Sequence, residues 1–260
     1  MQVKVVLVDI NSKMIQAWRD TFEENPEVEI VAGSMLDHKV SAWVSPTNSQ
    51  GSMDGGLDAV IKGHLGAQIE NRVRQQIKQL YGNALPVGHA TCVTTGRTLP
   101  EFLISTPTMH SSSEDISDSM NVALACGAAF QAVHIQNSKQ PGSIVSVALP
   151  GLGANTGRVA VEICADLMWS GYNLFRRHAY ATFAEMRAAL EAELGDLGSG
   201  SAKTPQSQGN QSQGNQSFGG SPKKSSPLPR AKANRSNPKR KRTRKRTSTT
   251  FEERTPLKLK

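Results

Sequence analysis

Short apolar runs alternate along the chain with longer segments in which apolar residues recur every three or four positions. Runs of the first kind indicate buried strands, and segments of the second kind indicate amphipathic helices. The pattern predicts strands at residues 3–8, 28–32, 40–44, 90–93, 102–105 and 144–149. It predicts helices from Ser12 to Phe22 and at residues 57–65, 69–82, 122–133, 159–169 and 182–194.

The order of these elements predicts an α/β fold. Strands and helices alternate along most of the chain, and the strands at 3–8 and 144–149 are apolar on both faces. Strands buried on both faces belong to mostly parallel sheets that carry helices on either side. We therefore expect a three-layer α/β/α sandwich with a mixed, mostly parallel central sheet.

Composition divides the chain near residue 198. Residues 1–198 hold 14 Lys and Arg against 20 Asp and Glu, whereas residues 199–260 hold 16 against 2. The second part consists mainly of Gly, Ser, Pro, Gln, Asn and basic residues, which bury too little apolar surface to offset the entropy of ordering. We expect one folded domain at 1–198, followed by a disordered linker and a basic tail at 199–260.

The basic tail contains the block PKRKRTRKR at 238–246. Such blocks act as nuclear localisation signals or contact nucleic acid phosphates, and the alternative is an inert solubilising tail. A nucleic acid or an import receptor is therefore an expected partner of residues 221–250. The expected location is intracellular: the nucleus in a eukaryote or in a virus of eukaryotes, and otherwise the cytoplasm.

Cysteine, histidine and hydropathy patterns argue against several classes of protein. The 3 Cys lie far apart and the 6 His show no ligand-like pairing, so we expect no metal site. An acid follows the first apolar run at Asp9, and no run approaches the roughly 20 apolar residues that span a bilayer. We therefore expect no secretory signal and no membrane partner.

Two polar loops each follow a predicted strand and lead into a predicted helix. They are SPTNSQGSMDGGLD at 45–58, called the first loop, and PGLGANTGR at 150–158, called the second loop. Gly lets the backbone approach a ligand closely, and the free N–H groups at a helix start attract an anion. Because ligands bind at the carboxyl ends of parallel strands, the two loops predict one site for a phosphate-bearing ligand.

The order of the motifs resembles the macro domain family. VEIVAGSMLDHKVSAWVSPTNSQGSMDGGLDAVIKGHLG resembles its strand, turn, strand and Gly-rich loop. LPVGHATCVTTG and LPEFLISTPTM resemble its middle strand pair, and SIVSVALPGLGANTGRVAVEICADLM resembles its second phosphate loop. The resemblance covers about residues 28–170, with 3–22 as an added strand and helix. It implies that the ligand is ADP-ribose, free or attached to a protein or nucleic acid, with no cofactor, and that some members hydrolyse the attachment.

The resemblance also implies roles for individual residues. The implied catalytic set is Asn48, which would contact the distal ribose, Asp58, which would orient or activate water, and Lys62, which would be a nucleophile if burial lowers its pKa. The residues implied to bind ADP-ribose are Asp9, Ser34, Met35, Asn48, Gly55, Gly56, Leu57, Asp58, Gly151, Gly153, Ala154, Asn155, Thr156 and Gly157.

Several positions depart from the family pattern. Ser34 replaces an adenine-contacting Asp, and we expect Asp9 to take over that hydrogen bond. Asn155 replaces a Gly, and Asn is the ordinary residue best able to adopt a positive φ. Asp54 replaces a small residue and adds charge near the expected phosphates.

Structural explanations compete with these assignments. Asn48 could simply close its turn through its own backbone, and Asp58 and Lys62 could be a surface pair one helical turn apart. A different class of function is also open, namely a nucleic-acid-binding protein in which the folded domain is a non-catalytic scaffold. A dinucleotide- or S-adenosylmethionine-dependent enzyme is disfavoured, because that fold needs a Gly-rich turn where Asp9 follows the first strand.

Overall fold

The computed structural model describes residues 3–112 and 114–199. Its strands are β1 (Lys4–Asp9), β2 (Val28–Ala32), β3 (Ala42–Ser45), β4 (Thr91–Thr94), β5 (Phe102–Ser105) and β6 (Ser146–Leu149). Its helices are α1 (Ser12–Thr21), α2 (Gly56–Leu65), α3 (Gln68–Tyr81), α4 (Asn121–Lys139), α5 (Val161–Arg177) and α6 (Phe183–Ser199), with a short 3-10 helix η1 (Met35–Asp37). The predicted linker and basic tail lie outside the described residues from residue 200 onward.

In the described part of the chain, the six strands form one sheet with the order β2-β1-β6-β3-β5-β4. The strand pairs are parallel, except that β4 runs antiparallel to β5 at one edge. The sheet is therefore mixed and mostly parallel, as the sequence predicted. Parallel pairing also brings the carboxyl ends of β1, β6, β3 and β5 to the same edge.

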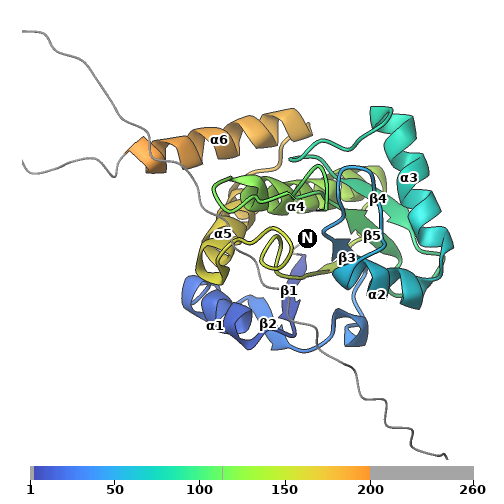
Figure 1. Cartoon of the computed structure of the whole chain (residues 1–260), viewed down its shortest axis with the longest axis horizontal. Coiled ribbons are helices and arrows are strands. Elements are labelled where there is room, and N and C mark those ends of the chain that lie inside the picture. The colour runs from blue at the N-terminus through green and yellow to red at the C-terminus, as the bar shows by residue number, and fades with distance from the viewer. Residues whose placement is uncertain (1–2, 113, 200–260) are drawn as a thin grey trace, which may run out of the picture. The chain divides into compact units, whose positions relative to one another are not determined.

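Both faces of the sheet are covered by helices. Val5 and Leu7 of β1 pack into a hydrophobic cluster with α1, α4, α5 and α6, whereas Val6 and Val8 pack into a second cluster with α2 and α3. This division follows from the alternation of side chains along a strand. Figure 1 shows α1 and α5 to the left of the strands and α2 and α3 to the right. The predicted three-layer sandwich is confirmed.

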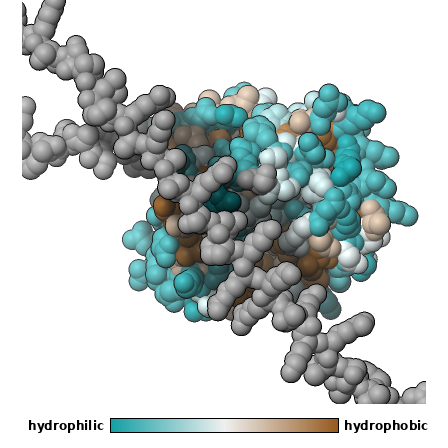
Figure 2. Space-filling view, viewed as in Figure 1, coloured by the Kyte–Doolittle hydropathy of each residue, from teal (hydrophilic) through white to brown (hydrophobic). Residues whose placement is uncertain are grey.

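Helix α3 illustrates how an amphipathic pattern builds one of these layers. Its buried residues are Ile69, Val73 and Ile77, which recur every four positions and face the sheet. Its other side chains are mainly polar, and hydrophilic residues cover the right-hand margin of the face in Figure 2, where α3 lies in the same view. The apolar stripe therefore fixes which face of α3 is buried.

Helices α4 and α5 extend beyond their predicted ends at residues 133 and 169. In α4 the added residues are half-buried or exposed, so the helix continues after its buried face has ended. In α5 the Ser170-Gly171 pair resembles a helix break, yet Gly171 lies where α5 crosses α4. A Cβ at Gly171 would lie 2.8 Å from the backbone nitrogen of Gly127 and 2.9 Å from the Cβ of Cys126. Gly171 is therefore a packing residue, because only a missing side chain allows this approach.

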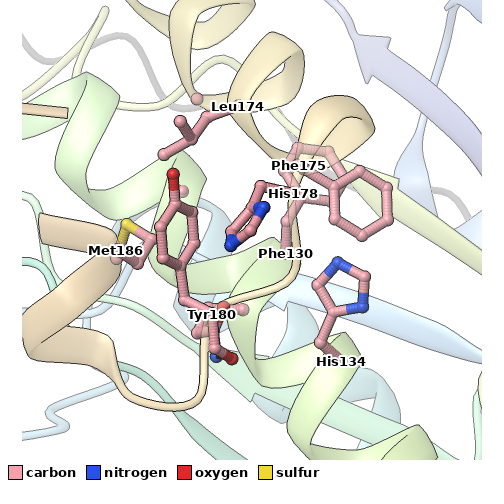
Figure 3. A pocket seen from close by; sticks show the side chains of 10 residues that line it. Phe130, His134, Leu174, Phe175, His178, Tyr180 and Met186 are labelled. Atoms are coloured by element: carbon pink, nitrogen blue, oxygen red, sulfur yellow. Dashed lines mark hydrogen bonds between the residues drawn. The ribbon is translucent and has the colours of Figure 1, made fainter. Parts of the chain in front are cut away.

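A small cavity of about 10 Å³ lies where α4, α5 and the segment before α6 meet. Figure 3 shows the rings of Tyr180 and His178 side by side at this place, with centroids 4.7 Å apart. Phe130 and Phe175 stack with ring centroids 4.5 Å apart, and Gln131 donates a hydrogen bond of 2.6 Å to the carbonyl of Tyr180. A space of this size holds about one water molecule, so the region is part of the core packing.

Among the residues that the structure describes, no helix combines the length and hydropathy that crossing a membrane requires. Within residues 3–112 and 114–199, no three His, Cys, Asp or Glu side chains are placed to hold a metal ion together.

We predict that Gly171→Ala lowers the free energy of unfolding by about 1–3 kcal/mol, because the new methyl group overpacks the contact between α5 and α4. Urea unfolding monitored by circular dichroism measures this difference. Gly63→Ala is the matched control, since Gly63 lies on the exposed side of α2 and a Cβ there meets no atom within 4 Å. The control should raise stability by a few tenths to about 1 kcal/mol through helix propensity. Equal effects of the two variants would contradict the packing role of Gly171.

Candidate ligand-binding cleft

A cleft of about 390 Å³ opens at the carboxyl edge of the sheet. This volume lies within the range of small-molecule sites. Its walls come from the ends of β1 and β2, the first loop with the start of α2, the segment after β5, and the second loop. The predicted ligand-binding residues that line it are Asp9, Ser34, Met35, Gly55, Gly56, Leu57, Asp58, Gly151, Gly153, Asn155, Thr156 and Gly157. The predicted residues Asn48, Lys62 and Ala154 are not part of this lining.

The first loop presents backbone to the cleft. Gly55 precedes α2 with extended angles (φ −140°, ψ 160°) and supplies no side-chain cap, and Gly56 has a φ of +53°. A Cβ at Gly55 or Gly56 would meet no atom within 4 Å, so both residues face open space. The first N–H groups of a helix lack intrahelical partners and carry the positive end of its dipole. The start of α2 can therefore bind an anion in the cleft.

Asp58 lies in the first turn of α2 and accepts a hydrogen bond from the Oγ of Ser45, which is fully buried at the end of β3. Burial raises the pKa of Asp58 to about 6, and the Ser45 hydrogen bond opposes this shift. A carboxyl group with such a pKa exchanges protons readily near neutral pH, as a general base requires. The alternative of a surface pair with Lys62 is not formed, because Lys62 pairs with other acids.

Lys62 points away from Asp58, toward two other carboxylates. Its Nζ lies 2.6 Å from Asp54 and 2.9 Å from Glu70. The hydrogen bond with Asp54, followed by that with Glu70, raises the pKa of Lys62. A nucleophilic Lys62 would need a lowered pKa, so the structure does not meet the condition on which that hypothesis depended.

Asn48 closes its own turn. Its Oδ1 accepts hydrogen bonds of 3.1 Å from the backbone N–H groups of Gln50 and Ser52. Its Nδ2 donates a 2.9 Å hydrogen bond to the Oγ of Ser112, in the segment after β5. Asn48 therefore acts in this structure as a turn residue outside the lining of the cleft, which was the structural alternative for it.

The second loop takes its positive φ angles at Gly153 (77°) and Arg158 (60°), and not at Asn155 as the sequence suggested. A Cβ at Gly157 would lie 2.7 Å from the carbonyl oxygen of Gly153, so Gly157 is required by the tight turn itself. Ala154 turns away from the cleft and packs against the hydrophobic core. The loop therefore keeps its shape without a Gly at position 155.

Asp9 connects the first strand to the second loop. Its Oδ1 accepts a 2.8 Å hydrogen bond from the N–H of Asn11, and its Oδ2 accepts one of 3.1 Å from the N–H of Gly151. Ser34, across the end of β2, caps η1 by accepting a 3.2 Å hydrogen bond from the N–H of Leu36. Asp9 thus lies in the cleft while it also holds the start of the second loop in place.

Pro46 and Pro150 belong to the two predicted loops, although neither was singled out. The cleft residues outside the predicted positions are Val8, Ile10, Gly33, Val60, Thr108 and Met109. Thr108 and Met109 follow β5, a parallel neighbour of β3, so the rule about carboxyl ends applied to them as well. Ile10 is 85% exposed, which is unusual for so apolar a side chain. Ile10 directly follows a strand and stands between the polar residues Asp9 and Asn11, and this was the signal that could have indicated it.

Comparison with known proteins identifies the class that this fold and cleft define. Residues 44–168 match the family model described as macro domain. A protein of Aquifex aeolicus (strain VF5), described as uncharacterized, is 30% identical over 142 residues, which are 55% of this chain and 78% of that protein. The chain belongs to the macro domain family. The matched range begins after β1 and β2, so the cleft residues Asp9, Ser34 and Met35 lie outside it.

Similar solved structures are also macrodomains. The macrodomain of Mycobacterium tuberculosis DarG has a TM-score of 0.47 at 21% identity, covering 55% of this chain and 88% of its own. The Oceanobacillus iheyensis macrodomain with ADP has a TM-score of 0.47 at 14% identity, covering 64% and 90%. Thermosipho africanus DarTG in complex with ADP-ribose has a TM-score of 0.42 at 15% identity, covering 64% and 49%.

We predict that Asp58→Asn stabilises the protein at neutral pH. The folded-state pKa of Asp58 is raised from 3.8 to about 6, so ionisation above that pH costs folding free energy, and Asn removes the charge while its Oδ1 can still accept from Ser45. The variant should gain about 1–2 kcal/mol near pH 7.5, after allowance for partial exposure, and the gain should fade as the pH falls from about 6 to 4.

Urea unfolding of both proteins across this pH range measures the difference. Glu101→Gln, which removes an exposed carboxylate outside the cleft, controls for the loss of one negative charge. Equal stability of wild type and Asp58→Asn near pH 7.5 would show that the folded state does not penalise the Asp58 carboxylate.

Proposed function

We propose that this macro domain binds ADP-ribose in the cleft, with the diphosphate held by backbone N–H groups of both loops. One observation carries the proposal: two Gly-bearing loops, each between a strand and a helix, line the same cleft, and the volume of that cleft suits a small molecule. Gly55 and Gly56 form one wall, and Gly153 and Gly157 form the other. Membership of the macro domain family supports the same ligand.

The charge of the cleft fits this mode of binding. Among its lining residues, all within the described ranges, there is no Lys or Arg, and the ionisable side chains are Asp9 and Asp58. Phosphate groups must therefore be bound by backbone donors and by the dipole of α2. The raised pKa of Asp58 reduces the repulsion, because part of the population is neutral near pH 6.

The end of the cleft between β1 and β2 is the proposed place of the adenine. Ser34 and Met35 form its floor with Asp9, and Ile10 offers an apolar surface to a ring. Both oxygens of Asp9 already accept backbone hydrogen bonds, yet a carboxylate has further lone pairs for the amino group of adenine. The distal ribose then lies toward Gly55, Gly56 and Asp58.

We predict that Gly55→Leu abolishes or strongly weakens ADP-ribose binding without unfolding the protein. Gly55 has extended angles that any residue can adopt, and its Cβ would enter open cleft space, so the new side chain competes with the ligand. Calorimetric titration of the full chain should show at least about tenfold weaker binding, with AMP and NAD as ligand controls. Gly63→Leu, on the exposed side of α2 and outside the lining, is the matched control. Unchanged affinity of Gly55→Leu would exclude this wall from the site.

We further propose that the cleft hydrolyses the bond between ADP-ribose and a substrate, with Asp58 as general base. The observation that favours it is a partly buried carboxyl group in the cleft, oriented by Ser45. The Asp58 carboxylate would take a proton from a water molecule, whose oxygen attacks the anomeric carbon of the distal ribose. The bond to the substrate breaks, and the departing group gains a proton. We assign no catalytic role to Asn48 or Lys62, because their polar groups are engaged elsewhere.

We predict that Asp58→Asn lowers the turnover of an ADP-ribosylated substrate by at least about a hundredfold, since loss of a general base removes a proton acceptor from the transition state. The affinity for free ADP-ribose should change by less than about threefold, because Asn is close to Asp in size. Release of ADP-ribose from a modified protein under single-turnover conditions measures the rate. Wild-type turnover in Asp58→Asn would remove Asp58 from the mechanism and leave a binding domain.

A further inference from the structure

The part of the first loop that faces the cleft cannot hold itself in place. Gly55 and Gly56 have no side chains, and added Cβ atoms there would meet nothing within 4 Å. Gly is also the residue with the most backbone freedom to lose on ordering. The position of this backbone must therefore be set by the residues on either side of it, which are Met53 and Asp54 before it and α2 after it.

The residues before Gly55 are held by side chains from α2 and α3. Met53 is fully buried, and its N–H donates a 3.3 Å hydrogen bond to Oε1 of Glu70 in α3. Asp54 accepts hydrogen bonds of 2.6 Å on each oxygen, one from Ser52 Oγ and one from Lys62 Nζ in α2. Both anchors depend on residues that lie outside the lining of the cleft.

Lys62 connects these two anchors. Its Nζ contacts Asp54 at 2.6 Å and Oε2 of Glu70 at 2.9 Å, so one ammonium group links the loop, α2 and α3. Glu70 is also held by Arg74 at 2.8 Å, and its side chain is only 15% exposed. Without Lys62, Asp54 would lose its contact with α2 and keep the hydrogen bond from Ser52, while Glu70 would keep its pairing with Arg74.

The same contacts explain the acidic residue at position 54. An Asp beside a diphosphate would weaken binding if its charge faced the phosphates. Here Asp54 is paired with Lys62, and the hydrogen bond from Lys62 is the largest cause of the lowered pKa of Asp54. Asp54 therefore serves as a tether for the loop, and its charge is offset by the Lys62 ammonium.

We propose that Lys62 is a positioning residue, whose ammonium group between Asp54 and Glu70 fixes the Met53–Gly56 backbone in the geometry that receives the phosphates. This role rests on the proposed binding of ADP-ribose in the cleft. It requires a positive charge of sufficient reach at position 62 and involves no covalent bond to the ligand. Arg satisfies this requirement, because its guanidinium can contact two carboxylates at once.

The test compares Lys62→Met, Lys62→Arg and the matched control Lys78→Met in the full chain. Lys78 is an exposed lysine in the last turn of the neighbouring helix α3. Lys62→Met should bind ADP-ribose about tenfold more weakly, and Lys62→Arg should stay within about threefold of wild type, since preorganisation of the loop governs affinity. Lys78→Met should bind as wild type. Wild-type affinity in Lys62→Met would overturn the proposal.

A second measurement keeps this inference separate from the proposed function. Hydrogen exchange of the backbone amides at 52–57 should be faster in Lys62→Met than in wild type, while the amides of β3 and β6 are unchanged. If wild type does not bind ADP-ribose, the proposed function fails and exchange alone decides the positioning role. If Lys62→Met does not fold, Asp54→Asn replaces it, because it removes the ion pair between Lys62 and the loop and keeps an oxygen that can accept from Ser52 Oγ. Unchanged exchange in the loop of the variant would overturn the proposal.

Turnover separates positioning from nucleophilic catalysis. Arg cannot form the covalent adduct that a nucleophilic lysine would form with the sugar carbon, because its guanidinium stays protonated. Lys62→Arg should therefore retain turnover within about threefold of wild type once the substrate is saturating. Loss of turnover in Lys62→Arg, with affinity retained, would overturn the positioning role in favour of chemistry at Lys62.

Discussion

The cleft depends on the pairing of β6 with β1 on one side and with β3 on the other. Parallel pairing aligns the carboxyl ends of these strands, so the loops that follow them must share one space. The hydrogen bond from Gly151 to Asp9 ties the end of β6 to the end of β1. The pairing of these three strands therefore brings together segments that lie more than a hundred residues apart in the chain.

A cleft whose described lining includes no basic side chain places a strict demand on its backbone. A flexible Lys or Arg can follow a phosphate, but an N–H group is useful only where the loop holds it. Each loop also has contacts outside the cleft: Glu70 and Lys62 bond to Met53 and Asp54 of the first, and Ile116 packs against Gly153 and Gly157 in the second. In the proposed binding mode, the residues that support the loops therefore matter as much as the residues that line the cleft.

Much of the fold could be read from the sequence because the sheet is buried on both faces. Runs such as 3–8 and 144–149 have one interpretation in an α/β chain, and the alternation of Val5 with Val6 between the two cores agrees with it. The errors concerned the lengths of helices α4 and α5, which the sequence predicted to end too early. Gly171 resembled a helix end, but its meaning depends on the contact with Gly127, which no local pattern contains. The two loops and their Gly residues were also predictable, since each loop follows a strand.

The sequence by itself determined the order of the elements, the layer architecture and the two Gly-bearing loops, because these follow from local periodicity and backbone preference. Only the tertiary structure decided what the polar side chains do. Asn48, Asp58 and Lys62 look alike as candidates in the sequence, yet Asn48 closes a turn, Lys62 pairs with Asp54 and Glu70, and the half-buried Asp58 accepts a hydrogen bond from Ser45. The physical reason is that hydrogen bonds, ion pairs and desolvation depend on distances between residues far apart in the chain, and folding alone sets those distances.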